Sequence, residues 1–171
     1  MSEIKNRVAE SGIISLDLAK YKPQEEIVGI DIAEQLWQGL VLKEKDFRQW
    51  IKDNDWSFYS NKAVYIHCSA DAIIPTWAYM LISSKLTGIA NNHLVGVKED
   101  LERLLIAENI QKEDVSHFKD ARVIIKGCSD IASADFAMVE LMKKIQPVVK
   151  SLMFGEPCST VPIYKNLTRN S

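Results

Sequence analysis

The chain has 171 residues, of which 47% are hydrophobic and 26% charged, and its formal net charge is −2. This composition is typical of a folded globular protein, and the length fits one domain, which we expect to span residues 1–171. The scattered lysines and arginines exclude a general nucleic-acid-binding protein, because such proteins carry a concentrated basic face.

The sequence predicts a cytoplasmic protein without a membrane segment. Residues 1–7 are polar and lack the apolar core of a secretory signal. The longest apolar stretch, residues 73–82, is shorter than the roughly 18 residues that a membrane-spanning helix needs. The three cysteines cannot all pair with one another, and the reducing cytoplasm disfavours structural disulfides.

The first third of the chain predicts two strands and a helix. Apolar and polar residues alternate over residues 14–18 and again over residues 26–32, as in half-buried strands. Phe47, Trp50 and Ile51 then share one face of a helix expected over residues 46–54.

Strands and helices alternate after this point. A continuous apolar strand over residues 62–67 precedes a helix over residues 73–86, in which Pro75 suits the first turn. A short strand over residues 93–97 and an amphipathic helix around residues 101–105 follow.

The last third repeats the alternation. A second continuous apolar strand covers residues 121–126, Ser133 can cap a helix that Pro147 closes, and residues 148–154 form the final strand. Strand–helix alternation of this kind predicts an α/β fold, with a mixed or mostly parallel sheet and helices on both of its faces.

All three cysteines follow an apolar run and precede a serine: Cys68, Cys128 and Cys158. An aspartate follows the first two within three residues, as Asp71 and Asp130. If the apolar runs are neighbouring parallel strands, the three thiols meet at the carboxyl edge of one sheet, where open α/β folds place their ligand sites.

Several properties of such a site favour a bound metal. A thiol between a strand and a helix amino terminus is expected to have a lowered pKa, because the helix dipole stabilises the thiolate. Three close thiolates repel one another unless a cation neutralises them, and zinc and iron–sulfur clusters use this ligand set. We therefore expect Cys68, Cys128 and Cys158 to hold zinc or an iron–sulfur cluster.

The residues around the thiols complete the expected site, with Ser69, Ser129 and Ser159 as hydrogen-bond donors and Asp71 and Asp130 as further polar groups. The two aspartates also suit helix caps, which is their simpler interpretation. His67, by contrast, points to the opposite face from Cys68 if the strand continues through both, because side chains alternate along a strand.

Two other classes of function stay open. One is an enzyme in which the thiolate of Cys68 or Cys128 attacks an acyl or sulfur-bearing substrate. The other is an interaction module whose cysteines are buried and idle, since free cysteine often behaves as a small hydrophobe. In that case exposed aromatic residues around Trp37 or Trp56 are expected to mark the partner surface.

The same segments resemble the uncharacterised bacterial family known as domain of unknown function 2480. The resemblance lies in CSADAIIPTWAYM at residues 68–80, KGC at residues 126–128, GEPCSTVP at residues 155–162 and QGLVLKEKDFR at residues 38–48. The family has no established activity. What the resemblance implies is a link to iron–sulfur cluster assembly proteins as partners, which favours the metal-binding interpretation over the catalytic one.

Overall fold

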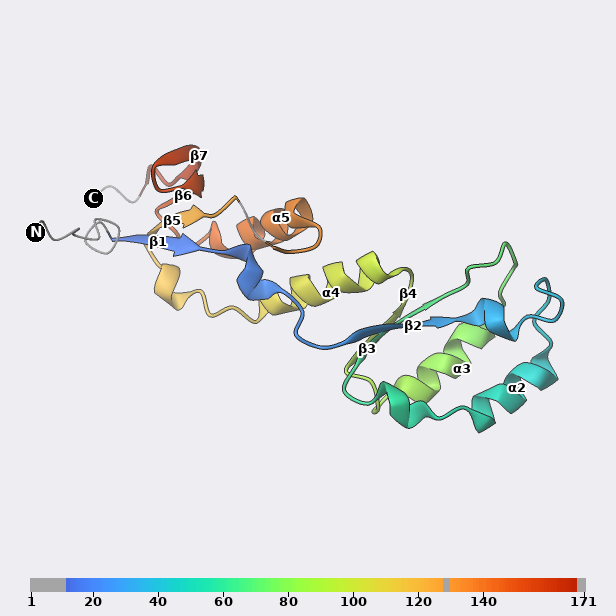
Figure 1. The fold of residues 1–171 in the computed structure, drawn as a ribbon. Coiled ribbons are helices and arrows are strands. Elements are labelled where there is room, and N and C mark those ends of the chain that lie inside the picture. Colours follow the sequence, from blue (N-terminus) through green and yellow to red (C-terminus); the bar gives the residue numbers. More distant parts are fainter. Residues whose placement is uncertain (1–11, 128–129, 169–171) are drawn as a thin grey trace, which may run out of the picture. The chain divides into compact units, whose positions relative to one another are not determined.

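The protein is described by a computed structural model, which covers residues 12–127 and 130–168 (Figure 1). Contacts within the chain define two compact units. Unit 1 comprises Met1–Pro23 and Arg103–Ser171, and unit 2 comprises Gln24–Glu102. Unit 2 is thus a continuous segment inserted into the sequence of unit 1. That residues 1–171 unfold as one domain stays a prediction.

Unit 2 contains a parallel sheet of three strands in the order β2-β3-β4. The strands are β2 (Ile27–Asp31), β3 (Ala63–His67) and β4 (Asn92–Val95), each parallel to its neighbour. The crossover from β2 to β3 carries helix α2 (Glu44–Asp53), and that from β3 to β4 carries α3 (Thr76–Leu86). Parallel neighbours need such crossovers, because a tight turn between two strands makes them antiparallel.

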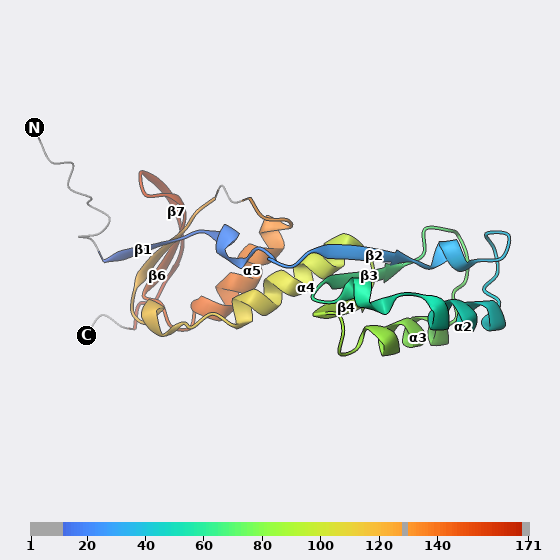
Figure 2. The same cartoon turned by 60° about the horizontal axis from the view of Figure 1, so that its bottom comes forward.

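Both helices of unit 2 pack on the same face of its sheet, as Figure 2 shows. Phe47 and Ile51 of α2 are buried because they recur at helical spacing on one side of the helix. They join Ile82 of α3 and the strand residues Val64 and Ile66 in one hydrophobic cluster. The alternate residues of β3 therefore point to the other face of the sheet.

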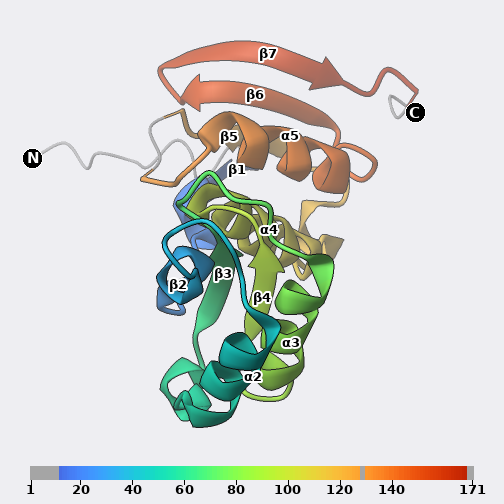
Figure 3. The ribbon, with the colours of Figure 1, turned by 90° about the vertical axis from the view of Figure 1, so that its right-hand side faces the viewer.

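Unit 1 contains a mixed sheet of four strands in the order β1-β5-β6-β7. The first three, β1 (Ile13–Leu16), β5 (Arg122–Ile125) and β6 (Ser151–Glu156), run parallel, and β7 (Ser159–Lys165) returns antiparallel to β6. Figure 3 shows β6 and β7 as two arrows of opposite direction. Because β7 is an edge strand, it tolerates Pro162, which lacks the backbone N–H that an inner strand needs.

Helices cover this sheet through a second hydrophobic cluster. Helix α5 (Ala134–Ile145) contributes Leu141 and Ile145, and helix α4 (Lys98–Gln111) contributes Ile106 and Ile110. These side chains pack with Val123 of β5 and Leu152 of β6, among other residues of the cluster. The short 3-10 turns Leu18–Tyr21 and Ser116–Phe118 close it at its ends.

The structure confirms an α/β fold with mostly parallel sheets and corrects three details of the sequence-based prediction. The strands that precede Cys68 and Cys128 were expected in one sheet, but β3 and β5 belong to different sheets. Strand β7 was not foreseen. Ser133 precedes α5, yet its side chain does not cap that helix; instead its Oγ accepts a hydrogen bond from Arg103 Nε at 3.1 Å.

Among the helices that the structure describes, none combines the length and the apolar character required to cross a bilayer.

Candidate functional site

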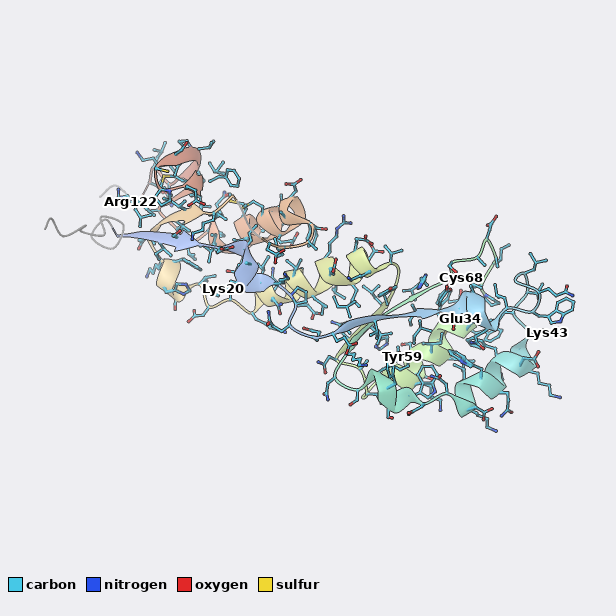
Figure 4. The ribbon with its side chains drawn as sticks, in the orientation of Figure 1. Lys20, Glu34, Lys43, Tyr59, Cys68 and Arg122 are labelled. Atoms are coloured by element: carbon cyan, nitrogen blue, oxygen red, sulfur yellow. The ribbon has the colours of Figure 1, made fainter. Side chains whose placement is uncertain are left out.

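The carboxyl edge of the unit 2 sheet gathers several chemistry-bearing residues. Strand β2 ends at Asp31, β3 ends immediately before Cys68, and β4 ends at Val95. Figure 4 labels Cys68 at this point of the chain. Because the three strands are parallel and in register, these ends lie side by side at one edge. Carboxyl edges of this kind are where α/β folds place ligand sites.

A carboxylate from β2 holds the loop that follows β3. Asp31 Oδ2 accepts a hydrogen bond from Ser69 Oγ at 2.5 Å, and Oδ1 accepts one from the Ser69 backbone N–H at 3.0 Å. Oδ1 also accepts a hydrogen bond from the backbone N–H of Ala33. Partial burial alone would raise the pKa of Asp31, but these hydrogen bonds and the nearby His67 outweigh it, so the pKa lies below its ordinary value.

Cys68 directly precedes Ser69, whose hydrogen bonds with Asp31 we call the Asp31 clamp. It is half-buried on the helix-covered side of the sheet. Its thiol packs against the hydrophobic cluster of unit 2 and donates a hydrogen bond to the carbonyl oxygen of Ala70 at 3.5 Å. Cys68 does not directly precede a helix, because α3 begins only at Thr76, after a loop.

The phenol of Tyr79, on α3, interacts electrostatically with Cys68. Burial raises the pKa of Tyr79, and a charge on Cys68 raises it further. A phenol with a raised pKa stays protonated around neutral pH and keeps its O–H as a hydrogen-bond donor. A neutral hydroxyl donor is therefore available close to the Cys68 thiol.

His67 turns away from this arrangement, as the alternation of the strand predicts. Its ring lies against that of Tyr65, with 5.3 Å between the ring centroids, on the face opposite the hydrophobic cluster. Gly29 of the neighbouring strand makes room for Tyr65, because a Cβ atom there would lie 2.5 Å from the tyrosine ring.

A groove of about 470 Å³ lies between α3 and the end of β4. Tyr79 contributes to its wall and also interacts electrostatically with Cys68, which does not itself line the groove. The lining consists of hydroxyl and apolar side chains, without a charged group among the described residues: Thr76, Tyr79, Met80, Ser83, Ser84 and Val95. Ser83 Oγ lies 2.7 Å from Nε2 of His93 on β4, a polar contact that fixes the helix to the strand.

The predicted site residues of unit 1 lie in other surroundings. Cys158 is exposed in the two-residue turn between β6 and β7, and Ser159 opens β7. Asp130 is exposed and pairs with Lys22 at 2.7 Å. Cys128 and Ser129 lie outside the described residues.

The helix-capping interpretation of the two aspartates is wrong. The residue that precedes α3 is Pro75, not Asp71, and the one that precedes α5 is Ser133, not Asp130. Asp71 lies exposed in the loop between β3 and α3.

Within residues 12–127 and 130–168, no three histidine, cysteine, aspartate or glutamate side chains come close enough together to hold a metal ion. Cys68 and Cys158 are both free thiols.

Three residues that matter at the unit 2 edge were missed from the sequence. Asp31 ends a strand whose alternation was recognised, so its place at a carboxyl edge could have been inferred from the same rule that singled out Cys68. Tyr79 and Ser83 lie in a helix that is apolar nearly all round, and nothing in that pattern distinguishes a groove-lining hydroxyl from a buried one.

Among known proteins, a family model matches residues 2–166, and that family is described as a protein of unknown function, DUF2480. No curated protein and no solved structure matches the chain.

Proposed function

The chain belongs to the DUF2480 family, and from this premise we propose that it carries out thiol chemistry at the carboxyl edge of unit 2. In this proposal Cys68 reacts with a small, neutral acyl or sulfur-bearing substrate held in the groove beside α3. The single observation that supports the proposal is the place of Tyr79, which lines the uncharged groove at the end of β4 and is near enough to Cys68 for a charge on the thiol to raise its pKa.

The chemistry can be written for a thioester substrate. The Cys68 sulfur, as thiolate, attacks the carbonyl carbon, and the carbon–sulfur bond of the substrate breaks. The acyl group stays on Cys68, and the departing thiolate takes up the proton that Cys68 released. Tyr79 supports this step because its protonated hydroxyl can donate a hydrogen bond to the oxyanion that develops on the carbonyl.

Acyl transfer from a small thioester tests the proposal. The protein is incubated with S-acetyl-N-acetylcysteamine, and acetylated cysteines are located by peptide mass spectrometry. We expect acetyl-Cys68 to form about tenfold faster than acetyl-Cys158, although Cys158 is the more exposed thiol, because oriented donors accelerate acyl transfer. Cys158→Ser should keep the fast labelling and Cys68→Ser should lose it.

Tyr79→Phe separates assisted transfer from simple accessibility. Loss of the hydroxyl should slow acetylation of Cys68 by about tenfold or more, with acetylation of Cys158 unchanged. Equal rates at the two thiols, or acetylation chiefly at Cys128 or Cys158, would refute the proposal.

A second proposal is the three-cysteine centre, in which Cys68, Cys128 and Cys158 bind zinc or an iron–sulfur cluster in a cytoplasmic protein that works with iron–sulfur assembly proteins. It requires free thiols, and Cys68 and Cys158 are both free. Metal analysis of protein purified without air decides it. Zinc or iron near one centre per chain, lost in Cys68→Ala, is expected; metal-free wild-type protein rejects it.

The interaction-module alternative predicts a surface at one tight turn of unit 2. Trp37 is 49% exposed and Leu40 is 64% exposed, whereas Trp56 is buried. Lys43 lies 4.0 Å above the Trp37 ring, which holds that ring at the surface. This class gains weight if replacement of all three cysteines by serine leaves a folded protein and neither acyl transfer nor metal is found in the wild type.

A further inference from the structure

A second pocket, in unit 1, has the opposite electrostatic character. It has a volume of about 620 Å³ and lies where β1, β5 and β6 begin and β7 ends. Its charged lining residues are Arg122, Lys150 and Lys165, and no carboxylate is found among the described residues that line it.

The topology of the sheet explains how three cations that are distant in sequence meet. Arg122 pairs in register with Ser151, and Ser151 pairs in register with Lys165. Residues in register on adjacent strands point to the same face, and the strands lie about 4.8 Å apart. Lys150 precedes Ser151 directly, and its backbone N–H donates a hydrogen bond to Ala121, which fixes it beside the start of β5.

The antiparallel strand β7 is what completes the group. A purely parallel sheet would place only strand beginnings at this edge. Because β7 runs back along β6, its last residue, Lys165, arrives at the edge where Arg122 begins β5 and Lys150 precedes β6. The three cations line one pocket, so their fields add there.

The remaining lining residues define the rest of the ligand. Ser151 and Tyr164 supply hydroxyl groups, and Leu152 and Met153 supply apolar surface. The volume falls within the range of about 300–1,000 Å³ typical of small-molecule sites. The guanidinium of Arg122 suits the paired oxygens of a phosphate or carboxylate, and the lysines add charge without demanding one geometry.

We propose that this pocket binds a small organic anion, a phosphate monoester or a carboxylate with an apolar body. It is a site separate from the thiol chemistry of unit 2, and the two proposals can fail independently.

Titration with matched probes tests the site. Phenyl phosphate, phenylacetate and the neutral phenol are added to the full chain at constant ionic strength, and binding is followed by calorimetry and by amide chemical shifts. We expect saturable binding of at least one of the two anions, with shifts at the beginnings of β5 and β6 and the end of β7. Phosphate and carboxylate are distinguished by which probe binds more tightly, and phenol should not saturate.

Charge-removing variants locate the binding. Lys150→Gln and Lys165→Gln should each weaken the binding of the anion by about tenfold, because each removes a positive charge from a pocket lining that contains no carboxylate among the described residues. Lys165→Arg should restore the affinity. The matched controls are Lys52→Gln and Lys85→Gln, which remove exposed lysines of unit 2.

Three outcomes would overturn the proposal. They are the absence of saturable binding for both anions, equal binding of phenol, and equal weakening by the control variants. Because all four lysines lie at least partly at the surface, their substitution should leave the thermal unfolding temperature unchanged, which is checked in the same samples.

Discussion

In unit 2 the thiol after a parallel strand packs against the hydrophobic cluster and the groove along α3 is uncharged, whereas in unit 1 Cys158 is exposed in a hairpin turn and the pocket at the beginnings of the strands is basic. The two regions begin from the same sequence pattern, an apolar run followed by cysteine and serine. The difference teaches that this pattern marks the end of a strand. The surroundings of the thiol depend on the strand beside it, which is β2 for Cys68 and β7 for Cys158.

The candidate sites also use opposite edges of their sheets. The unit 2 groove reaches Val95, the carboxyl end of β4. The unit 1 pocket lies at the amino ends of its parallel strands, where the antiparallel β7 brings Lys165.

The substitutions with the largest expected effects test whether the two units unfold together as one cooperative domain. Ile82→Ala in unit 2 and Leu141→Ala in unit 1 each remove a fully buried side chain, and each should lower the free energy of unfolding by about 2–5 kcal/mol. Chemical denaturation measures the loss, and hydrogen exchange shows which amides become less protected. The single-domain prediction expects both units to lose protection together.

Controls for these two substitutions lie on the same helices. Met80→Ala and Val139→Ala remove exposed side chains and should change stability by less than about 0.5 kcal/mol. Loss of protection confined to the substituted unit would contradict the single-domain prediction.

The next effect compares two glycines. Gly155 has φ of +118°, and a Cβ atom there would lie 2.5 Å from the backbone oxygen of Ser159. Gly155→Ala should therefore cost about 2 kcal/mol or more by thermal or chemical unfolding. At Gly29 the obstacle is the end of the Tyr65 side chain, which can move, so Gly29→Ala should cost about 1 kcal/mol.

A double variant checks this reasoning. Tyr65→Ala should largely remove the added cost of Gly29→Ala, because the ring is the group in the way. No variant of a single side chain should rescue Gly155→Ala. If Gly29→Ala proved the more costly of the two, the predicted difference between backbone and side-chain obstruction would be wrong.

A smaller effect concerns the loop that positions Cys68. Asp31→Asn weakens the hydrogen bonds to Ser69 and Ala33 and should cost about 1 kcal/mol at neutral pH. Because the pKa of Asp31 is lowered by folding, its contribution is complete above the unfolded pKa of about 3.9 and is lost as the pH falls through the folded value. The stability difference between wild type and variant should shrink below about pH 4; a constant difference down to lower pH would contradict this.

The smallest effect is expected at Asp130 of unit 1. The ion pair of Asp130 with Lys22 joins two exposed side chains, so Asp130→Asn should change stability by less than about 0.5 kcal/mol. Unfolding curves of the Asp31→Asn and Asp130→Asn variants give the comparison directly. A loss at Asp130 as large as that at Asp31 would contradict the predicted difference between the two aspartates.

Local pattern was sufficient to predict most of the elements. The continuous apolar runs became β3 and β5, and the helical spacing of Phe47 and Ile51 gave α2. Strand β7 was missed because Pro162 interrupts it and most of its side chains are exposed, so it lacks the periodicity of a buried strand.

The choice of strand partners could not be read from the sequence. An apolar strand buried on both faces looks the same in either sheet, and pairing β1 with β5 depends on packing against helices from elsewhere in the chain. The neighbours of the candidate site residues could not be predicted for the same reason. Cys68 was found from its strand, but its clamp at Asp31 and its neighbour Tyr79 depend on tertiary contacts.

The insertion of unit 2 within unit 1 has a consequence for biosynthesis. Unit 2 is one continuous segment, so all of its strands have been translated before β5 emerges from the ribosome. Strand β1 must wait for Arg122–Ile125 before it has a partner, and its unpaired edge is available to other nascent chains during that interval. We therefore expect closing of the unit 1 sheet to be a slow step of folding, because β1 and β5 are distant in the sequence.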